Sequence, residues 1–520
     1  MTRRDAAFWL GSLAVTVGVV LHLPMYWMGR NMGFVLVNMP MEREMYAGMA
    51  LIVLGIAAAA YGLLPASRAD AQEHGPETLA PAEDATLTPR HWLVLAALAV
   101  GLVIDIMKPA SLGFVTPGMS AEYRVDPATV ALFPLSALAG TTVGSFIWGA
   151  LADLYGRRAS IMLSAVMFIG TSICGAMPSF WWNVFMCFLM GCAAGGMLPV
   201  AYALLAELMP TKHRGWCLVL IGGIGAVGGY FAASALSALL QPYFGWRIMW
   251  FLNLPTGLML IALSPLLPES ARFLMHRGRF AEARSILERF GVGTAPASVP
   301  RADGDVQAVS VEHRYLEPTI ALTLVALAWG LVNFGVLLWL PSALIAEGHS
   351  VGLASSIIAQ SALLSAPVVI ACVYLYGRWS TKWSLVAMTA VMTAGLVALM
   401  LRGIGVQFLS NPLIPLTLLV LGSSGVISIL LPYTAENYPI GVRGRATGWV
   451  AGCSKLGGLL AQGLSALAFV PALGTAALGV AVPAAASLLL ISMFGHETRG
   501  RDLRELEARP RIKELGTSRP

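Results

Sequence analysis

Three ionisable side chains stand inside long apolar stretches of this sequence. Asp105 and Lys108 are one helical turn apart within the apolar segment 92–118, and Lys455 lies within the segment 446–470. Charges in membrane-length segments are rare and mark substrate or proton pathways. A buried carboxylate takes up a proton readily unless a cation pairs with it, and two lysines against one carboxylate favour an anionic ligand. We therefore predict proton and substrate binding at Asp105, Lys108 and Lys455.

Each of these charges also has a purely structural interpretation. Lys108 and Asp105 share a helical face, so the two could form a static ion pair, and the long side chain of Lys455 could reach the membrane surface. In the functional interpretation, a substrate carboxylate bridges Lys108 and Lys455 and leaves Asp105 free to bind a proton. Asn333, in another apolar segment, adds a neutral polar group for substrate binding.

The rest of the chain consists mainly of segments that can cross a bilayer. Apolar residues make up 57% of the 520 residues and charged residues only 12%, about half the charged fraction of a soluble domain. This composition excludes a soluble enzyme and a nucleic-acid-binding module. A helix crosses a bilayer with about 20 apolar residues. Fourteen segments are of about this length or longer: 7–27, 44–64, 92–118, 129–151, 159–177, 181–206, 216–240, 247–267, 318–341, 352–376, 384–401, 413–435, 446–470 and 473–494. The sequence thus predicts an all-α integral membrane protein.

The basic residues are distributed unequally between the two ends of these segments. With the N-terminus inside, 26 of the 33 Lys and Arg residues fall on the inner side, five on the outer side and two within the spans. Lys and Arg accumulate on the cytoplasmic side of membrane proteins. We therefore expect both termini in the cytoplasm and a location in the plasma (inner) membrane.

Short patterns recur at one constant offset. The pattern from Glu207 to Arg214 recurs from Glu436 to Arg443, and the glycine pair at 228–229 recurs after the same 229 residues. A constant offset indicates two six-helix halves of one topology, here preceded by two additional helices. Parallel halves of this kind bind their substrates at the interface between them, near the bilayer midplane.

These features divide the chain into six expected parts. The soluble stretch between the two halves contains an apolar helical face formed by Phe280, Ala283 and Ile286, as in amphipathic helices that lie on a membrane. The parts are an N-terminal transmembrane hairpin (1–64), an acidic cytoplasmic linker (65–91), an N-terminal six-helix half (92–267), a central cytoplasmic loop with the amphipathic helix (268–316), a C-terminal six-helix half (317–494) and a basic cytoplasmic tail (495–520).

A short loop motif lies between the second and third helices of the N-terminal half. From Gly149 to Arg158 it reads G-A-L-A-D-L-Y-G-R-R, with glycines that allow tight turns and close helix approach. It resembles the loop signature G-x-L-a-D-r-x-G-R-r of the major facilitator superfamily. The segments 268–274 and 496–503 resemble the P-E-S-x-R-[WF]-L and P-E-T-K-G-x-x-L runs of its sugar porter and organic-ion branches.

This resemblance implies a fold and a gate. The fold is a core of twelve helices in two halves, which the N-terminal hairpin extends to fourteen. The resemblance also implies that Asp153 pairs near Arg445, at the start of the eleventh core helix, and so locks the outward-open state. The two basic residues that follow Gly156 also fit the positive-inside pattern alone. The expected gating residues are Gly149, Asp153, Gly156, Arg157, Arg158, Glu207, Arg214, Glu436, Arg443 and Arg445.

Together these features predict a secondary transporter that moves a small organic solute by alternating access. The charge balance favours an organic anion, such as a carboxylate or an aromatic acid, carried with protons, and the sequence resembles metabolite:proton symporters. A sugar or other neutral-metabolite porter, an exporter and a non-transporting nutrient sensor remain alternatives. We predict no enzymatic activity, no metal and no cofactor. The expected partners are the substrate, protons and the lipid bilayer, without nucleic acid, and we expect a monomer.

Overall fold

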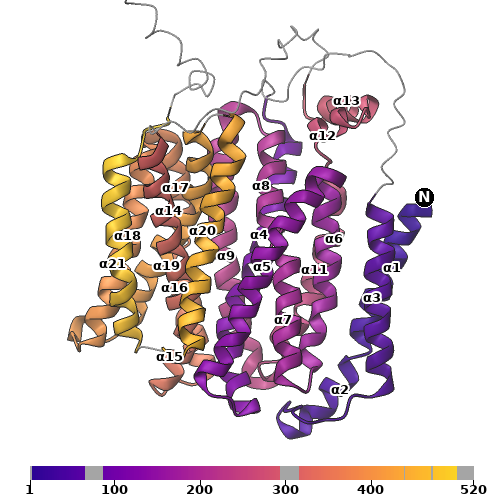
Figure 1. The fold of residues 1–520 in the computed structure, drawn as a ribbon, viewed down its shortest axis with the longest axis vertical. Coiled ribbons are helices and arrows are strands. Elements are labelled where there is room, and N and C mark those ends of the chain that lie inside the picture. The colour runs from indigo at the N-terminus through magenta and orange to yellow at the C-terminus, as the bar shows by residue number, and fades with distance from the viewer. Residues whose placement is uncertain (1–2, 65–85, 293–314, 439, 470–471, 500–520) are drawn as a thin grey trace, which may run out of the picture.

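The computed structural model describes residues 3–64, 86–292, 315–438, 440–469 and 472–499. Within these residues every regular element is helical, and the long helices stand side by side along one direction (Figure 1). Thirteen helical segments among them are long and apolar enough to cross a membrane. A further helix, α20 (Ile440–Ala466), stands beside them but is more polar, because it carries Arg445, Lys455 and Gln462. With α20, the described residues provide the fourteen membrane-length segments that the sequence predicts.

The chain begins with a helical hairpin, whose two long helices pack through glycines. The Cα hydrogen of Gly11 faces the backbone of α3, where an added Cβ would come within 2.5 Å of the carbonyl oxygen of Gly55, and a Cβ on Gly18 would come within 2.6 Å of that of Gly48. Small residues at such spacing allow close packing of membrane helices. The elements are α1 (Arg3–Val20), α2 (Leu23–Met28), the 3₁₀ turn η1 (Gly29–Met32) and α3 (Arg43–Leu63).

The N-terminal half of the core follows with six helical units, three of which are interrupted. Two short helices, α12 (Ala271–His276) and α13 (Phe280–Arg289), come after it and pack against each other. The six units are α4 (Pro89–Tyr123); α5 (Pro127–Tyr155); α6 (Arg157–Gly170) with η3 (Thr171–Ala176); α7 (Phe180–Ala194) with α8 (Met197–Leu208); α9 (Thr211–Phe244); and α10 (Ile248–Phe251) with α11 (Asn253–Ala262) and η4 (Ser264–Leu266).

The C-terminal half repeats this arrangement with six further units. Its first unit contains a π-helical turn, η6, in the middle of the span, and its second ends in another, η7. The units are α14 (Leu316–Leu331) with η6 (Val332–Val336) and α15 (Leu337–Ala346); α16 (Val351–Ser365) with α17 (Val368–Tyr374) and η7 (Leu375–Trp379); α18 (Thr381–Gly403) with η8 (Gln407–Leu409); α19 (Leu413–Asn437); α20; and α21 (Leu473–Phe494). The two halves and the added hairpin confirm the predicted architecture.

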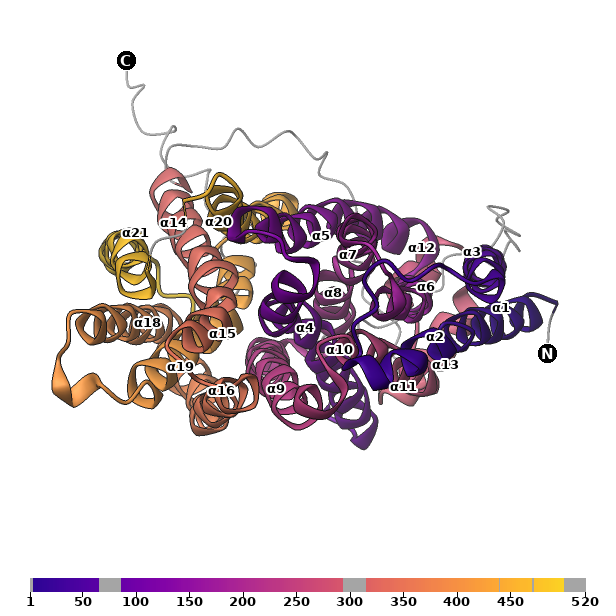
Figure 2. The ribbon, with the colours of Figure 1, turned by 90° about the horizontal axis from the view of Figure 1, so that it is seen from below.

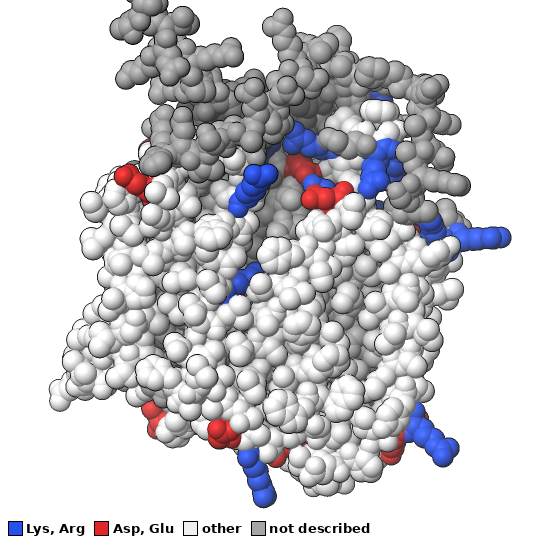
Figure 3. Space-filling model, viewed as in Figure 1, with Lys and Arg blue, Asp and Glu red and all other residues white. Residues whose placement is uncertain are grey.

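The hairpin, the N-terminal half and the C-terminal half lie in a row when the bundle is viewed along its helices (Figure 2). Each half has its own apolar core. We call the end of the bundle that carries α12 and α13 the α13 end, and the opposite end, with α2 and α15, the α2 end (Figure 1). Charged side chains gather at these two ends, and the band between them is almost entirely uncharged on the face in Figure 3, as a bilayer requires.

Candidate functional site

The predicted charges lie together across the interface between the halves. Asp105 belongs to α4 of the N-terminal half, and Lys455 to α20 of the C-terminal half. The carboxylate of Asp105 interacts electrostatically with the ammonium groups of both Lys108 and Lys455. No hydrogen bond or salt bridge joins Asp105 to either lysine in the described part of the chain. The three groups therefore form one electrostatic cluster whose members are not locked in direct contact.

Lys108 points away from the interface, into the interior of the N-terminal half. Its side chain is 3% exposed, and its ammonium group lies against the ring of Phe168 in α6. It also lines a small cavity with Trp250 and Asn253, which belong to α10 and α11. The sequence could not show this direction, because α4 is apolar around most of its circumference.

Asn333 lies in the π-helical turn η6, at the corresponding depth of the C-terminal half. The turn packs against α20, where a Cβ on Gly458 would come within 2.7 Å of the Cβ of Phe334, and Gln462 of α20 donates a hydrogen bond of 2.5 Å to the carbonyl oxygen of Phe334. Single π-turns inside α-helices are frequent at functional sites. The carboxamide of Asn333 makes no hydrogen bond within the described residues, so it is available to a ligand.

The two halves are closed against each other towards the α2 end. A Cβ on Gly113 of α4 would come within 2.6 Å of the carbonyl oxygen of Leu338 in α15. The hydroxyl groups of Ser237 in α9 and Ser355 in α16 share a buried hydrogen bond of 2.8 Å. Tyr230 adds a hydrogen bond of 3.3 Å to the backbone of α15. Contacts this close leave no passage between α4 and α15 at Gly113.

Towards the α13 end, the facing helices α5 and α20 are apart. A Cβ added to Gly149 of α5, or to Gly444, Gly448 or Gly452 of α20, would meet no atom within 4 Å. Asp153, one turn beyond Gly149, has a side chain that is 73% exposed. The helices do contact each other elsewhere along their length. The bundle is therefore closed at the α2 end and open between α5 and α20 at the α13 end.

The loop motif is organised around the guanidinium group of Arg157. This group pairs with Asp153 at 3.2 Å and with Glu207 of α8 at 3.1 Å. The backbone N–H of Arg157 donates to Glu269, 2.7 Å away. Gly156 has φ +107°, and a Cβ there would come within 2.4 Å of the same carboxylate. Glycine is therefore needed at position 156 for both its backbone conformation and its closeness to Glu269.

A matching arrangement occurs at the start of α18 in the C-terminal half. The carboxylate of Glu497 accepts hydrogen bonds from the backbone N–H of Thr381 at 3.0 Å and from its hydroxyl at 2.7 Å, and it also accepts one from Ser380. Thr498 donates to Glu436 at 2.8 Å, just as Ser270 donates to Glu207 in the N-terminal half. Each half therefore fastens the end of its last helix to the start of its third.

The two carboxylates differ in their proton affinity. Burial raises the pKa of Glu269 above the usual value for glutamate, although the backbone N–H groups of Ser270, Arg157 and Arg158 oppose this effect. Burial also raises the pKa of Glu497, but hydrogen bonds from Ser380, Thr381 and the backbone of Arg499 outweigh it and bring the pKa to about 2. The N-terminal network is thus the one that loses its charge first on acidification.

The remaining predicted gating residues lie near these networks at the α13 end. Arg158 is exposed and donates its backbone N–H to Glu269 at 3.4 Å. Arg214 belongs to the first turns of α9, and Arg445 is exposed on α20. The side chain of Arg443 lies outside the described residues. Asp153 pairs with Arg157 in this structure, not with Arg445.

Four residues of the two networks were not predicted as functional, although the sequence contains a signal for them. Glu269 and Ser270 are followed by Glu497 and Thr498 at an offset of 228 residues, which is within one residue of the offset of the internal repeat. Equivalent acid–hydroxyl pairs after the last helix of each half predict equivalent contacts.

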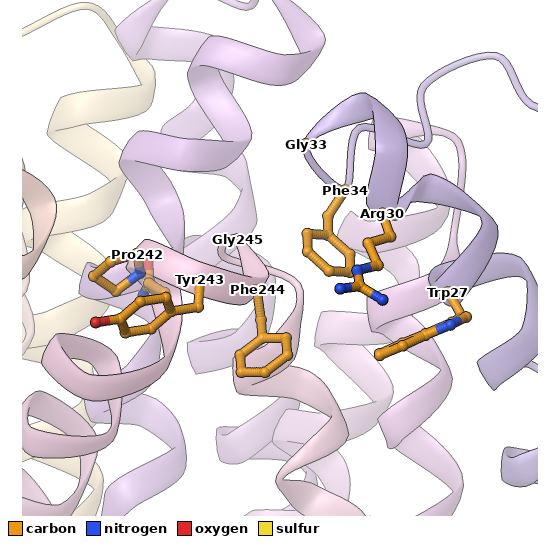
Figure 4. Close-up of a pocket in the computed structure, with 9 residues that line it drawn as sticks. Trp27, Arg30, Gly33, Phe34, Pro242, Tyr243, Phe244 and Gly245 are labelled. Carbon is orange, nitrogen blue, oxygen red and sulfur yellow. The ribbon is translucent and has the colours of Figure 1, made fainter.

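A separate groove of about 630 Å³ lies at the α2 end, between the hairpin and the end of α9. Trp27, Arg30 and Phe34 line it from the hairpin, and Tyr243 and Phe244 from α9 (Figure 4). The guanidinium group of Arg30 lies over the Trp27 ring at 5.2 Å. None of the three central charges lines this groove, so it is distinct from the site between the halves.

Comparison with known proteins supports the same fold and class. The model of the Major Facilitator Superfamily matches residues 93–462. The chain is 25% identical over 381 residues to the niacin transporter NiaP of Acinetobacter baylyi, covering 71% of this chain and 85% of that protein. It is 27% identical over 412 residues to the benzoate transport protein of the same organism, covering 73% and 83%. The solved structure of the xylose transporter XylE from E. coli, in a partially occluded inward open conformation, superposes with a TM-score of 0.66 at 17% identity, covering 80% of this chain and all of that one.

Two matched helical halves with charges at membrane depth and an opening at one end define a multi-pass membrane transporter. The chain belongs to the Major Facilitator Superfamily, which confirms the resemblance carried by the loop motif. It is therefore a transporter of small molecules and not an enzyme.

Proposed function

We propose that this protein is a proton-coupled transporter of a small organic carboxylate, which it moves by alternating access. The observation that carries this proposal is the cluster of Asp105, Lys108 and Lys455, in which two cations surround one carboxylate between the halves. A substrate carboxylate supplies the negative charge that this cluster lacks. Neutral sugars would leave the charge unbalanced.

Within this proposal the substrate binds mainly from the C-terminal half. Lys455 provides the cation for the carboxylate, and the free carboxamide of Asn333 lies on the neighbouring turn η6. Lys108 contributes its charge from inside the N-terminal half, because its side chain is buried beneath Phe168. A carboxylate on Lys455 draws that cation away from Asp105 and so favours protonation of Asp105. Proton and substrate then strengthen each other's binding, and this coupling is reciprocal.

The names of two relatives support the same substrate class. One relative is named for niacin and the other for benzoate, and both compounds are aromatic monocarboxylic acids. An apolar ring with one carboxylate suits a site in which a few polar groups interrupt apolar helices.

The proposed orientation places the α13 end in the cytoplasm of a cell bounded by a plasma (inner) membrane. The excess of Lys and Arg predicted for the inner side supports it, and both the described start of the chain at α1 and the described end after α21 lie at the α13 end (Figure 1). The structure would then represent an inward-open state of a monomer. The domain boundaries expected from the sequence belong to the same proposal.

Transport by purified protein in proteoliposomes tests this function. Radiolabelled benzoate or nicotinate should accumulate when the outer solution is more acidic than the lumen, and a protonophore should abolish the accumulation. Xylose serves as the neutral control. Accumulation of xylose without accumulation of either acid would favour the sugar-porter alternative and contradict the proposal.

A further inference from the structure

A small cavity inside the N-terminal half is surrounded by hydrogen-bond donors. Its volume is about 10 Å³, and it lies between α4, α7, α10 and α11. Trp250 and Asn253 are only 4% and 3% exposed. The indole N–H of Trp250 and the carboxamide nitrogen of Asn253 are both buried without an acceptor in the described part of the chain. Buried donors are nearly always paired in folded proteins, so two unpaired donors beside one cavity indicate a missing acceptor.

The third donor is the ammonium group of Lys108, which lines the same cavity. A fully buried cation is costly unless a counter-charge lies beside it. The ring of Phe168 lies against this ammonium group and offers a weak cation–π interaction. Asp105 lies one turn away, but Lys455 also interacts with its carboxylate. The cluster therefore retains one positive charge, and Lys108 lies at the end that faces the cavity.

The remaining lining offers almost no acceptor. The hydroxyl group of Ser111 donates to the carbonyl oxygen of Met107 at 2.7 Å, and Val115, Met190 and Met249 are apolar. A water molecule would accept hydrogen bonds from two of the donors, but its own two hydrogens would lack partners, and it would leave the charge of Lys108 uncompensated. A monatomic anion accepts from all three donors and compensates the charge.

We propose that this cavity is a halide-binding site, in which Lys108, Trp250 and Asn253 hold one chloride ion inside the N-terminal half. The volume fits a single atom of about the size of a water molecule. An aromatic carboxylate would have to displace the ring of Phe168 or Trp250, so the site is separate from that of the transported acid. The proposal therefore stands whether or not the transported substrate is a carboxylate.

Thermal unfolding of the purified full-length protein tests this site without any transport substrate. The unfolding temperature is measured in sodium gluconate and in sodium chloride or bromide at equal ionic strength. Halide should raise it in a saturable manner by a few °C, and Lys108→Gln should remove this rise. Trp250→Phe keeps the ring but removes one N–H donor, and it should raise the half-saturating halide concentration several-fold.

Trp329→Phe is the matched control. Trp329 is also buried, but its indole N–H already donates to the carbonyl oxygen of Ser423 at 2.9 Å in the C-terminal half, so this variant should keep the full halide response. Bromide in crystals of the wild-type protein should give one anomalous peak in contact with Lys108, which tests the site even if a variant fails to fold.

Three results would overturn the proposal. The first is an unfolding temperature of the wild type that is the same in gluconate and halide, which would mean that Lys108 is a neutral amine and accepts from one of the other donors. The second is a halide response that survives in Lys108→Gln. The third is a Lys108-dependent response to benzoate in halide-free buffer without bromide binding, which would assign the cavity to the substrate carboxylate.

Discussion

Arg247 and Glu122 form a buried ion pair that joins three parts of the molecule. The guanidinium group of Arg247 is fully buried and lies 2.7 Å from the carboxylate of Glu122 at the end of α4. The same carboxylate accepts the backbone N–H groups of Leu36 at 2.8 Å and Val37 at 3.2 Å, from the loop between η1 and α3. The added hairpin is therefore fastened to the first and last helices of the N-terminal half at a single carboxylate.

Glu122→Gln should strongly destabilise the protein and loosen the hairpin. Removal of one partner from a buried ion pair costs about 3–5 kcal/mol, because the other charge stays buried. The measurement is thermal unfolding in detergent, together with proteolysis of the hairpin loop. The matched control is Glu347→Gln, which breaks an ion pair with Arg402 of similar length, 2.6 Å, near the surface and should cost about 1 kcal/mol or less. Equal effects of the two substitutions would contradict this account.

Asp105→Asn should abolish proton-driven accumulation but leave exchange of substrate across the membrane largely intact. The amide cannot carry a proton, whereas its size and depth in α4 are unchanged. Uptake and counterflow in proteoliposomes distinguish the two activities. Asp126→Asn is a suitable control, because Asp126 is an exposed residue that caps α5. Accumulation by Asp105→Asn at the wild-type level would exclude Asp105 as the coupling residue.

Lys455→Gln should weaken carboxylate binding by roughly tenfold or more, since one charge-assisted hydrogen bond is worth about 1.5–3 kcal/mol. The affinity of wild-type protein for nicotinate should rise as the pH falls, because proton and substrate binding reinforce each other. Isothermal titration at two pH values measures both effects. Lys382→Gln, at the start of α18, should bind like the wild type. A lysine that merely reaches the membrane surface would give the same isotherm after substitution.

The fold could be predicted from the sequence because it depends on features that extend over many residues. Apolar segments of membrane length and the constant offset of 229 residues are both sufficient to define two matched halves. Even α20, the most polar span, was recognised through its position in the repeat. The interruption of α14 at Asn333 was not predicted, since nothing in the local composition distinguishes a π-turn from a regular helical turn.

The site was predictable in its residue types but not in its geometry. Asp105 and Lys455 are found together as expected, because both are charges at the same depth. The direction of Lys108 depends on which face of α4 meets α6 and α10, and a helix that is apolar on all sides does not reveal this. Glu269 and Glu497 were missed for a different reason. Their partners Arg157 and Thr381 lie more than a hundred residues away, so their contacts exist only in the folded chain.

The two gate carboxylates should respond differently to pH. Since the pKa of Glu269 is raised in the folded protein, the wild type should gain stability relative to Glu269→Gln as the pH falls through that pKa. The pKa of Glu497 is lowered to about 2, so its contribution is complete above the usual glutamate value of about 4.3 and is lost only below it. Between pH 7 and pH 5, the difference in unfolding temperature between wild type and Glu497→Gln should therefore stay constant. Glu282→Gln, at an exposed position of α13, should show no pH-dependent difference. The same pH profile for the Glu269 and Glu497 variants would contradict the assignment.

Asp153→Asn should shift the protein further towards the state that is open at the α13 end. In this structure Asp153 is mostly exposed and pairs only with Arg157 of its own loop, so its loss costs little in the open state. If the motif locks the opposite state through the start of α20, as the family resemblance implies, then only that state loses an interaction. A cysteine at Gly448 reports the change, because Gly448 faces open space in this structure and should be covered when α5 and α20 close. Five of the six native cysteines are buried, so background labelling should be low, and Gly448→Cys alone gives the reference rate. A membrane-impermeant maleimide should label Gly448→Cys faster when Asp153→Asn is also present. An unchanged rate would mean that the acid serves topology alone and does not gate transport.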